Sequence, residues 1–342
     1  MKTGEDIAWL PEGTIVTCPH GNLAGEYTVL RQQNRGTSGL VYQVQSNRTG
    51  EIHALKEFYV KGAVRLQDLT LRIPETTEAG TLKELFMDEP VAFTQSEAWT
   101  NDDHDGLAIP RSEVFVWQGN SYYLMDWAEG ISLCQWMKSN ALHPEKGRPV
   151  TLDQCLRILT QLGDTIRRLH DKGWVHLDIA PQNIMVHTDD EENIHVKLVD
   201  FGLMRTLESF GSEPSIAMRG TPGFSDLPWE HESYERILKD TDSRHQIRLL
   251  DIYAMGAMIA YLCMLPYKHV IHERDEIHMR NFLHEMRYHP DRIWAQVAAE
   301  YPAPEERTTI AALFRLAKQA TDNNFDTRIR DTWTFLLALR AY

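Results

Sequence analysis

The sequence predicts an α+β chain with two lobes, a small β-rich lobe followed by a larger α-helical lobe. Three observations support this prediction. The chain has 342 residues, a size at which two lobes can share one site. Up to residue 127, short segments rich in β-branched and aromatic residues alternate with turn signals. From residue 152 on, apolar residues recur at spacings of three and four, as on one face of a helix.

The first lobe is predicted to consist mainly of strands. The first three strands are expected at 27–30, 39–45 and 52–59. Residues 61–80 are expected to form a long irregular link. A helix is expected at about 82–95, although Pro90 lacks the N–H that a helix interior needs. The next two strands, at 113–117 and 121–127, should form a hairpin.

The second lobe is predicted to be mainly helical. Its first helix carries an apolar stripe made of Leu152, Cys155, Leu156, Leu159, Leu162, Ile166 and Leu169. A short strand is expected at 196–199, and further helices at 251–264, 308–320 and 331–339. The expected divisions are an N-terminal extension at 1–24, a first lobe at 25–126 and a second lobe at 127–342, with a hinge near 126–130.

Composition and charge indicate the cellular compartment and the kinds of partner to expect. The formal net charge of −14 disfavours electrostatic binding to nucleic acid or to anionic lipid. The four cysteines include no CxxC pair, which suits a reducing compartment. The opening residues lack the pattern of a secretory signal, and the most apolar stretch, 252–265, is too short to span a bilayer. We therefore expect a cytoplasmic protein without a membrane span.

One segment of the second lobe carries the most specific chemistry. Residues 175–183 read Val-His-Leu-Asp-Ile-Ala-Pro-Gln-Asn, and Asp200-Phe201-Gly202 follows the expected strand at 196–199. Asp178 can accept a hydroxyl proton while Asn183, five residues on, binds Mg²⁺. Asp200, on a tight glycine turn, can bind the metal from another side.

This segment resembles the protein-kinase family, whose pattern is H-R-D-x-x-x-x-N followed by D-F-G. The resemblance implies that Asp178 is the catalytic base or substrate orienter and that Asn183 and Asp200 are magnesium ligands. It also implies ATP as the phosphate donor and a protein substrate as the acceptor. The chain departs from the pattern at Leu177, which stands where the family has arginine.

Two segments of the first lobe resemble the family's phosphate-binding elements. The stretch from Asn34 to Val41 resembles the glycine-rich loop, with Asn34 in place of its first glycine and with Gly36 and Gly39 retained. Residues 53–56, His-Ala-Leu-Lys, resemble V-A-I-K, which implies that Lys56 holds the α- and β-phosphates.

Lys56 needs a carboxylate partner, and two residues are candidates. Glu89 is favoured over Glu84, because residues 86–89 resemble the helix segment that supplies the partner in bacterial relatives. By the same resemblance Met125 is the gatekeeper, and Asp126 C=O and Ala128 N–H bind the adenine edge. The residues expected to sandwich the adenine ring are Val41, Ala54 and Met185.

Further stretches match the family downstream. Residues 220–224 resemble G-T-P-G-Y, and 251–256 match the helix that anchors the large lobe. The family's A-P-E is blurred at 226–230, where Glu230 is expected to be a buried acid paired with Arg328. The fifteen histidines show no metal-binding spacing, so no zinc site is expected.

Three functions are compatible with these motifs. The favoured one is a bacterial-type Ser/Thr protein kinase. A pseudokinase is the alternative, because Leu177 and Ala180 depart from the family's catalytic loop. A small-molecule kinase shares that loop but lacks the stretches at 220–224 and 251–256. Because of Ala180, the sequence does not decide between Ser/Thr and Tyr as the phosphorylated residue. It also does not identify the protein substrate or the oligomeric state.

Leu177 also predicts how the enzyme is regulated. In kinases with arginine at this place, the guanidinium binds a phosphorylated activation segment. Leucine offers neither charge nor donor, so a phosphate in this segment would gain little by docking. The candidate positions are Ser209, Ser212, Ser215 and Thr221. We therefore expect activity that does not require phosphorylation of these positions.

Overall fold

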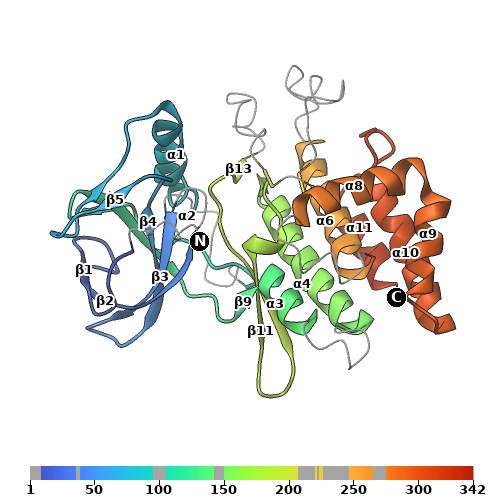
Figure 1. Cartoon of the computed structure of the whole chain (residues 1–342), viewed down its shortest axis with the longest axis horizontal. Helices are drawn as coiled ribbons and strands as arrows, with labels where there is room; N and C mark the ends of the chain where they lie inside the picture. Colours follow the sequence, from blue (N-terminus) through green and yellow to red (C-terminus); the bar gives the residue numbers. More distant parts are fainter. Residues whose placement is uncertain are drawn as a thin grey trace, which may run out of the picture. The chain divides into compact units, whose positions relative to one another are not determined.

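The computed structural model describes residues 9–35, 39–94, 105–141, 150–206, 220–221, 223–225, 246–264 and 275–341. The described residues fall into two units (Figure 1). The first unit holds those up to residue 94 together with 108–128, and the second holds 105–107 and those from 129 on. The first unit is built on a β-sheet and the second is mainly helical, which is the two-lobed α+β fold that the sequence predicts.

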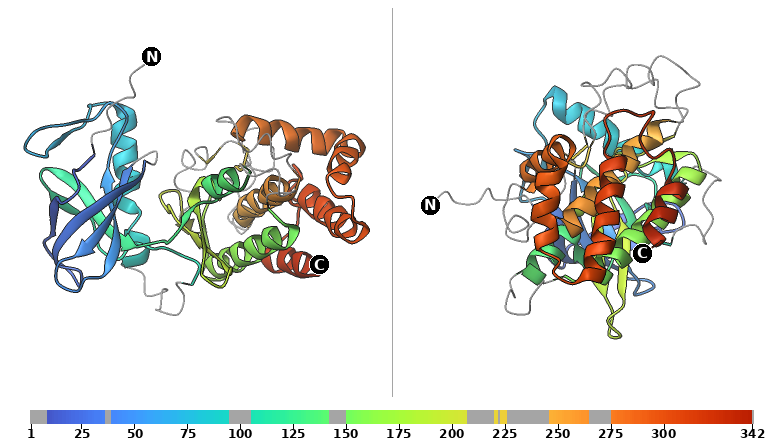
Figure 2. Two further views of the ribbon diagram at one scale, coloured as in Figure 1. Left: turned by 60° about the horizontal axis from the view of Figure 1, so that its bottom comes forward. Right: turned by 90° about the vertical axis from the view of Figure 1, so that its right-hand side faces the viewer.

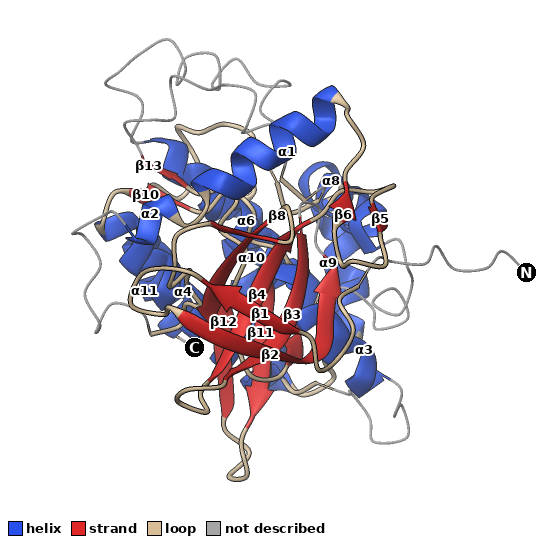
Figure 3. Ribbon diagram, turned by 90° about the vertical axis from the view of Figure 1, so that its left-hand side faces the viewer, coloured by secondary structure: helices blue, strands red, loops and turns tan. Residues whose placement is uncertain are grey.

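The first unit is built on a six-stranded antiparallel sheet with the order β1-β2-β3-β4-β8-β7. Figure 3 shows strands of this sheet in red. The strands are β1 (Ile15–Cys18), β2 (Gly25–Arg35), β3 (Gly39–Ser46), β4 (Ile52–Phe58), β7 (Phe115–Trp117) and β8 (Asn120–Asp126). The predicted hairpin is present, and Gln118 and Gly119 turn it with positive φ angles of 47° and 74°. The edge strand β1 lies inside the segment expected to be an N-terminal extension, and it pairs with β2.

One face of this sheet carries the hydrophobic core of the first unit. Side chains alternate between the two faces of a strand, and residues directly opposite each other in a ladder share a face. The register pairs Tyr42 with Leu55 and Glu57 with Tyr122, and Leu124 continues the same row. All five residues are buried, so the Glu57 carboxylate lies among apolar side chains.

Hydrogen bonds from four side chains compensate the burial of Glu57, whose residue exposure is 0%. Tyr42 Oη and Arg65 Nη2 each donate to Oε2 at 2.6 Å. Asn120 Nδ2 donates to Oε1 at 3.0 Å, and Tyr122 Oη donates to the same oxygen. Burial raises the pKa of both tyrosines, which therefore remain protonated donors. The network joins strands from distant parts of the chain through one carboxylate.

We expect Glu57→Gln to lower the free energy of unfolding by about 3 kcal/mol, because it leaves Arg65 without its buried anionic partner. Urea unfolding of the full chain, followed by circular dichroism, measures this loss. Glu51→Gln is the matched control, since the Glu51 side chain is 68% exposed and its loss should cost no more than about 0.5 kcal/mol. Equal losses for the two variants would contradict the stabilising role of the Glu57 network.

The prediction of an irregular link over 61–80 is wrong in two places. Two short strands, β5 (Val64–Arg65) and β6 (Leu71–Arg72), pair with each other. Helix α1 (Thr77–Asp88) then begins five residues earlier than expected, because Thr76 caps it by accepting a hydrogen bond from Ala79 N at 3.0 Å. The helix ends before Pro90, and a separate short helix, α2 (Val91–Thr94), follows.

The second unit is mainly helical, and its helices lie side by side in both views of Figure 2. They are α3 (Leu133–Ala141), α4 (Leu152–Asp171), α6 (Arg248–Cys263), α8 (Asp275–Tyr288), α9 (Pro290–Ala299), α10 (Pro304–Ala320) and α11 (Thr332–Arg340). Helix α6 is buried along almost its whole length, with α4 and α10 packed against it. The sequence predicts α4, α6, α10 and α11, whereas α3, α8 and α9 come from the structure alone.

Short strands complete the second unit. A three-stranded sheet has the order β12-β11-β9, from β9 (Ile131–Ser132), β11 (Ile184–Thr188) and β12 (Ile194–Leu198). A two-stranded sheet pairs β10 (Trp174–Val175) with β13 (Arg205–Thr206). None of the four cysteines forms a disulfide. Among the helices of the described ranges, none has the length and apolar character needed to cross a membrane.

Candidate active site

In the first unit, the sheet face opposite the core gathers the residues expected to bind nucleotide. The register pairs Val41 with Lys56 and Ala54 with Met125, so all four side chains project from the same face. Gly39 lies on this face too, and a Cβ there would come within 3.1 Å of Lys56 Cγ. Glycine at this position therefore leaves room for the lysine stem.

Helix α1 supplies the carboxylate partner of Lys56. Phe86 packs its ring against Phe58 and Tyr123, with centroid distances of 5.5 and 5.0 Å, and this fixes the helix on the Lys56 face of the sheet. Glu89 lies three residues on, at the helix end, and its Oε2 is 2.7 Å from Lys56 Nζ. Both side chains are almost fully buried, with exposures of 5% and 0%.

The other candidate partner, Glu84, is exposed on α1. Its position follows from helix geometry, because a residue two places from Phe86 points away from the face that packs on the sheet. Among the described contacts, the structure therefore pairs Lys56 with Glu89.

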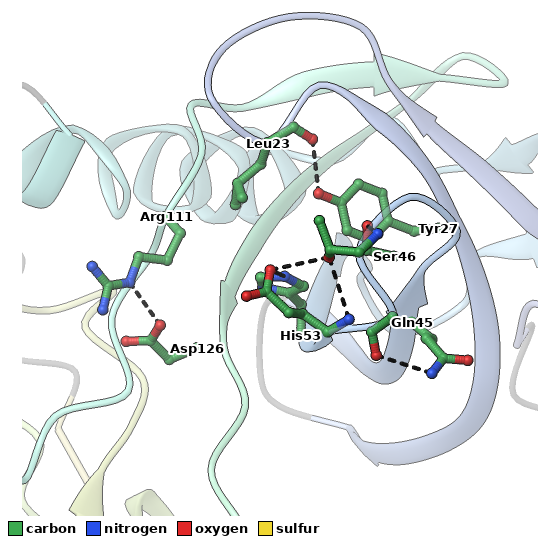
Figure 4. Close-up of polar contacts among 10 residues, drawn as sticks. Leu23, Tyr27, Gln45, Ser46, His53, Arg111 and Asp126 are labelled. Carbon is green, nitrogen blue, oxygen red and sulfur yellow. Dashed lines mark hydrogen bonds and ion pairs between the residues drawn. The ribbon is translucent and has the colours of Figure 1, made fainter.

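The end of β8 holds the residues expected at the adenine edge. The Asp126 carboxylate accepts a hydrogen bond from Arg111 Nε at 2.6 Å (Figure 4). The backbone N–H of Asp126 donates to Ile109 O at 2.9 Å. Ala128 is buried, as is Met125. These contacts fix the backbone of β8 at its end.

Three of the predicted nucleotide-binding residues lie elsewhere than on this face of the first sheet or are only partly described. The Asn34 backbone pairs with Val41 between β2 and β3, and Gly36 lies outside the described residues. Met185 belongs to the second unit, where it lies on β11 opposite Lys197.

In the second unit, Asp251 of α6 shapes the segment that leads to Asp178. Its fully buried carboxylate accepts hydrogen bonds from His176 N at 2.8 Å and Leu177 N at 2.9 Å. His170 Nε2, on α4, lies 2.8 Å from Asp251 Oδ2. With these bonds the backbone of Leu177 adopts a left-handed conformation, with φ of 67°, which is unusual for a leucine. The next residue, Asp178, is oriented by this turn.

Asp251→Asn should destabilise the second unit in a pH-dependent way. Burial raises the pKa of Asp251, but the hydrogen bond from His170 and the charges of the two neighbouring histidines outweigh it, so the net pKa is lowered from 3.8. A lowered folded-state pKa contributes stability above the ordinary value, and this contribution is lost as the pH falls through the lowered one.

We therefore expect the variant to lose about 3 kcal/mol of unfolding free energy at pH 7 and progressively less below about pH 4. Urea unfolding across this pH range measures the difference. Asp153→Asn, at an exposed aspartate of α4, is the control. A difference between wild type and variant that does not change with pH would contradict the charged role of Asp251.

Asp178 is held by bonds to both of its carboxylate oxygens. Oδ1 accepts from Thr221 N at 2.8 Å and from Thr221 Oγ1 at 2.7 Å. Oδ2 accepts from Asn183 Nδ2 at 2.8 Å, and the same amide group donates to Asp178 O at 2.9 Å. Oδ2 therefore keeps an acceptor position beyond the one that Asn183 uses.

The β11–β12 hairpin brings Asn183 close to Asp200. The register pairs Ile184 with Leu198, so Asn183, which precedes β11, lies opposite Val199, which follows β12. Val199 N donates to Asn183 O at 2.9 Å and extends the ladder by one bond. Asp200 comes next, in a left-handed conformation with φ of 65°. Because Asn183 uses its Nδ2 group on Asp178, its Oδ1 is the atom available to a cation.

The pKa of Asp178 is shifted by its burial and by its polar neighbours. Burial raises its pKa above the ordinary 3.8, the Thr221 hydrogen bonds oppose the rise, and the nearby Asp200 carboxylate adds to it. His176, buried between Asp178 and Asp251, has a lowered pKa because burial outweighs the attraction of the surrounding carboxylates. Two carboxylates close together favour a cation beside them.

Two residues at this site could not be assigned from the sequence. Gln182 donates from Nε2 to Thr221 Oγ1 at 2.6 Å, and the same hydroxyl donates to Asp178. The sequence placed Thr221 in the stretch that resembles G-T-P-G-Y and named it as a candidate phosphorylation position, but it assigned no contact to Thr221 and no role to Gln182. The only sequence signal for this contact was that both residues lie in kinase-like stretches.

Several predicted features fall outside the described residues. They are Glu230, Ser209, Ser212 and Ser215. Arg328, the expected partner of Glu230, is buried and donates from Nη1 to Leu249 O at 2.9 Å. Among the described residues, no group of three or more His, Cys, Asp or Glu side chains could hold a metal ion without other ligands.

Comparison with protein families gives one match over most of the chain. A model described as the protein kinase domain matches residues 27–329. Among curated proteins, the serine/threonine-protein kinase Nek4 of Mus musculus is 24% identical over 302 residues, which is 84% of this chain and 32% of that protein. Serine/threonine-protein kinase D of Synechocystis is 28% identical over 160 residues, 45% of this chain and 26% of that protein.

This chain spans about a third or less of the length of these curated relatives. Among solved structures, PpkA-294 in its apo form aligns over 97% of this chain and all of its own, with a TM-score of 0.60 and 21% identity. The kinase domain of Mycobacterium tuberculosis PknI aligns over 97% of this chain and 99% of its own, with a TM-score of 0.54 and 16% identity. At these identities the structures establish the shared fold.

Proposed function

Because the chain belongs to the protein kinase family, we propose that it is an ATP- and magnesium-dependent kinase that phosphorylates Ser or Thr hydroxyls of a protein substrate. The observation that carries this proposal is the arrangement around Asp178. Its carboxylate is fixed on one side by Thr221 and keeps an acceptor position on Oδ2. A substrate hydroxyl that donates to Oδ2 would be aligned for attack and would lose its proton there.

Asn183 and Asp200 have the donor atoms that Mg²⁺ requires. Magnesium prefers oxygen ligands and is usually bound by one or two protein groups together with substrate phosphates. Asn183 offers Oδ1, and Asp200 lies close enough to raise the pKa of Asp178. When bound there, the metal would neutralise charge on the phosphates and relieve the repulsion between the two aspartates.

In the first unit, Lys56 is proposed to hold the α- and β-phosphates. Its pairing with Glu89 fixes the ammonium at one place on the sheet face. The apolar side chains of Val41, Ala54 and Met125 on the same face suit the flat adenine ring. Asp126 C=O and Ala128 N–H are proposed to bind the adenine edge.

The direct test is incubation with γ-labelled ATP, Mg²⁺ and a generic protein substrate, followed by acid hydrolysis to identify the labelled amino acid. We expect label on phosphoserine or phosphothreonine and none when EDTA replaces Mg²⁺. Label on phosphotyrosine would refute the hydroxyl class. Absence of label under all conditions would refute the enzyme activity.

A pseudokinase is the second candidate, and it rests on Leu177 and Ala180. Neither offers a polar side chain at a position where the family's catalytic loop commonly has a basic one. A pseudokinase would bind nucleotide without transferring phosphate. Thermal unfolding with ATP and Mg²⁺, set beside the labelling assay, separates the two functions, because only the kinase gives both a shift and a labelled product.

We expect activity without phosphorylation of the activation segment. Leu177 uses its backbone N–H on Asp251 and has no side-chain donor for a phosphate. The Thr221 hydroxyl is buried and engaged with Asp178. Phosphatase-treated protein should retain its specific activity, with mass spectrometry confirming that Ser209, Ser212, Ser215 and Thr221 are unmodified. A loss of about tenfold or more, equivalent to about 1.4 kcal/mol, would show phospho-gating instead.

We also propose a cytoplasmic setting for the chain. Its four cysteines form no disulfide, as is usual in reducing compartments. The net charge of −14 disfavours electrostatic binding to nucleic acid. The proposed partner is a protein substrate.

A further inference from the structure

A chain of three side chains links the segment at 220–225 to the catalytic loop. Gln182 Nε2 donates to Thr221 Oγ1 at 2.6 Å, and Thr221 Oγ1 donates to Asp178 Oδ1 at 2.7 Å. Thr221 N donates to the same carboxylate oxygen at 2.8 Å. We call these three residues the Gln182–Thr221–Asp178 relay.

The direction of each hydrogen bond follows from its donors. A hydroxyl has one proton and two lone pairs. Because the Gln182 amide donates into a lone pair of Thr221 Oγ1, the hydroxyl proton is left to point at Asp178. A carboxylate is the stronger acceptor in this set, so the arrangement is stable only with this polarity. The carboxylate and the Gln182 amide therefore determine together which way the Thr221 hydroxyl proton points.

Tight local packing makes this contact possible. A Cβ at Gly220 would lie 1.9 Å from Ser225 Oγ and 2.9 Å from Leu177 O. Any other residue at 220 would push the chain away from the catalytic loop. The glycine lets Thr221 approach Asp178 with both its N–H and its hydroxyl. Thr221 is only 7% exposed, so water competes poorly for these bonds.

We propose that Gln182 is a positioning residue: it keeps the Thr221 hydroxyl proton on Asp178 Oδ1, so that the other oxygen, Oδ2, is turned toward the substrate hydroxyl. The orientation of Oδ2 toward a substrate hydroxyl rests on the proposed function. The relay itself does not depend on it, because all three residues and their bonds lie within the second unit.

Two substitutions separate polarity from packing. Gln182→Glu keeps the shape but turns the donor into an acceptor that competes for the Thr221 proton. Gln182→Met keeps a similar length and removes the donor without introducing a competing acceptor. The relay predicts a larger effect for glutamate than for methionine, whereas a role in filling space predicts the reverse order, since glutamate is closer to glutamine in shape.

The first measurement needs no catalysis. Hydrogen exchange of the Thr221 amide, which donates to Asp178 Oδ1, is followed by NMR in the full chain. We expect roughly tenfold faster exchange in Gln182→Glu, which corresponds to the loss of about one charge-assisted hydrogen bond, and a smaller change in Gln182→Met. In a Thr221→Val background, Gln182→Glu should add little further change. An equal effect in both backgrounds, or a larger effect for methionine, would overturn the relay.

The second measurement is the labelling assay. We expect Gln182→Glu to lower kcat about tenfold with KM for ATP unchanged, because the variant alters the orientation of the base and not the nucleotide contacts. Thr221→Ser, which retains a hydroxyl, should keep most of the activity that Thr221→Val loses. An unchanged kcat in an active enzyme would overturn the positioning role. If wild type transfers no phosphate, the proposed function fails, and amide exchange alone decides the relay.

Discussion

Asp178→Asn is expected to reduce kcat by about 10²–10⁴-fold, the usual contribution of a general base. The variant keeps the shape of the side chain but removes the acceptor that takes the substrate proton. The structure also predicts where the amide will point. Oδ1 must stay toward Thr221, which donates two hydrogen bonds, so the new NH₂ group replaces Oδ2 and faces Asn183 Nδ2.

This orientation places a donor against a donor and costs about 1 kcal/mol of unfolding free energy, the value of one lost hydrogen bond. The loss of activity should therefore be far larger than the loss of stability can explain. The labelling assay and urea unfolding measure the two effects on the same preparation. Asp171→Asn, at an exposed aspartate of the same unit, is the matched control. Wild-type turnover in Asp178→Asn would remove Asp178 from the mechanism.

Lys56→Met is expected to abolish measurable phosphate transfer and to destabilise the chain. The activity is lost because the ammonium group proposed to hold the phosphates is removed. The stability falls because the buried Glu89 carboxylate loses its ion pair with the ammonium, which we expect to cost about 3 kcal/mol. A lysine that simply projected into solvent would give the first effect without the second.

A double variant separates these two effects. Lys56→Met with Glu89→Leu replaces both charges with apolar groups and should recover much of the lost stability. It should remain inactive. Lys83→Met, at an exposed lysine of α1, is the control for removal of a positive charge. Activity in either Lys56 variant would assign the phosphates to another residue, and a stable single variant would contradict the energetic role of the pair.

The sequence alone predicted the elements whose signal is local. Strand β3, helix α4 and the β7–β8 hairpin each follow from periodicity or from a turn within a short window. Local signals failed where elements are short or weakly patterned. Strands β5 and β6 have two residues each, and α9 has ten residues with only Ile293 and Val297 as buried apolar positions. Helix α8 is different, because Met279, Leu283 and Met286 form a buried apolar stripe at helical spacing that was not recognised.

Contiguous motifs also determined most of the proposed site. Asp178, Asn183 and Asp200 were selected because their spacing along the chain matches one chemistry. Lys56 was selected because residues 53–56 resemble V-A-I-K at the right distance after the glycine-rich stretch. Each of these residues belongs to a short contiguous motif, which can be identified from the sequence without knowledge of the fold. Their roles remain predictions, and the assays described above test them.

Only the tertiary structure decided which residues meet across long stretches of chain. The resemblance favoured Glu89 over Glu84 as the partner of Lys56, and the structure decides for Glu89, 33 positions away. Thr221 reaches Asp178 across 43 positions, a contact that no motif indicated. Glu57 meets Asn120 across 63 positions. Such contacts depend on how one element packs on another, and periodicity reports only which face of an element is buried, not what covers it. For that reason the sequence supplied the reactive groups, and packing determined the partners that hold them in place.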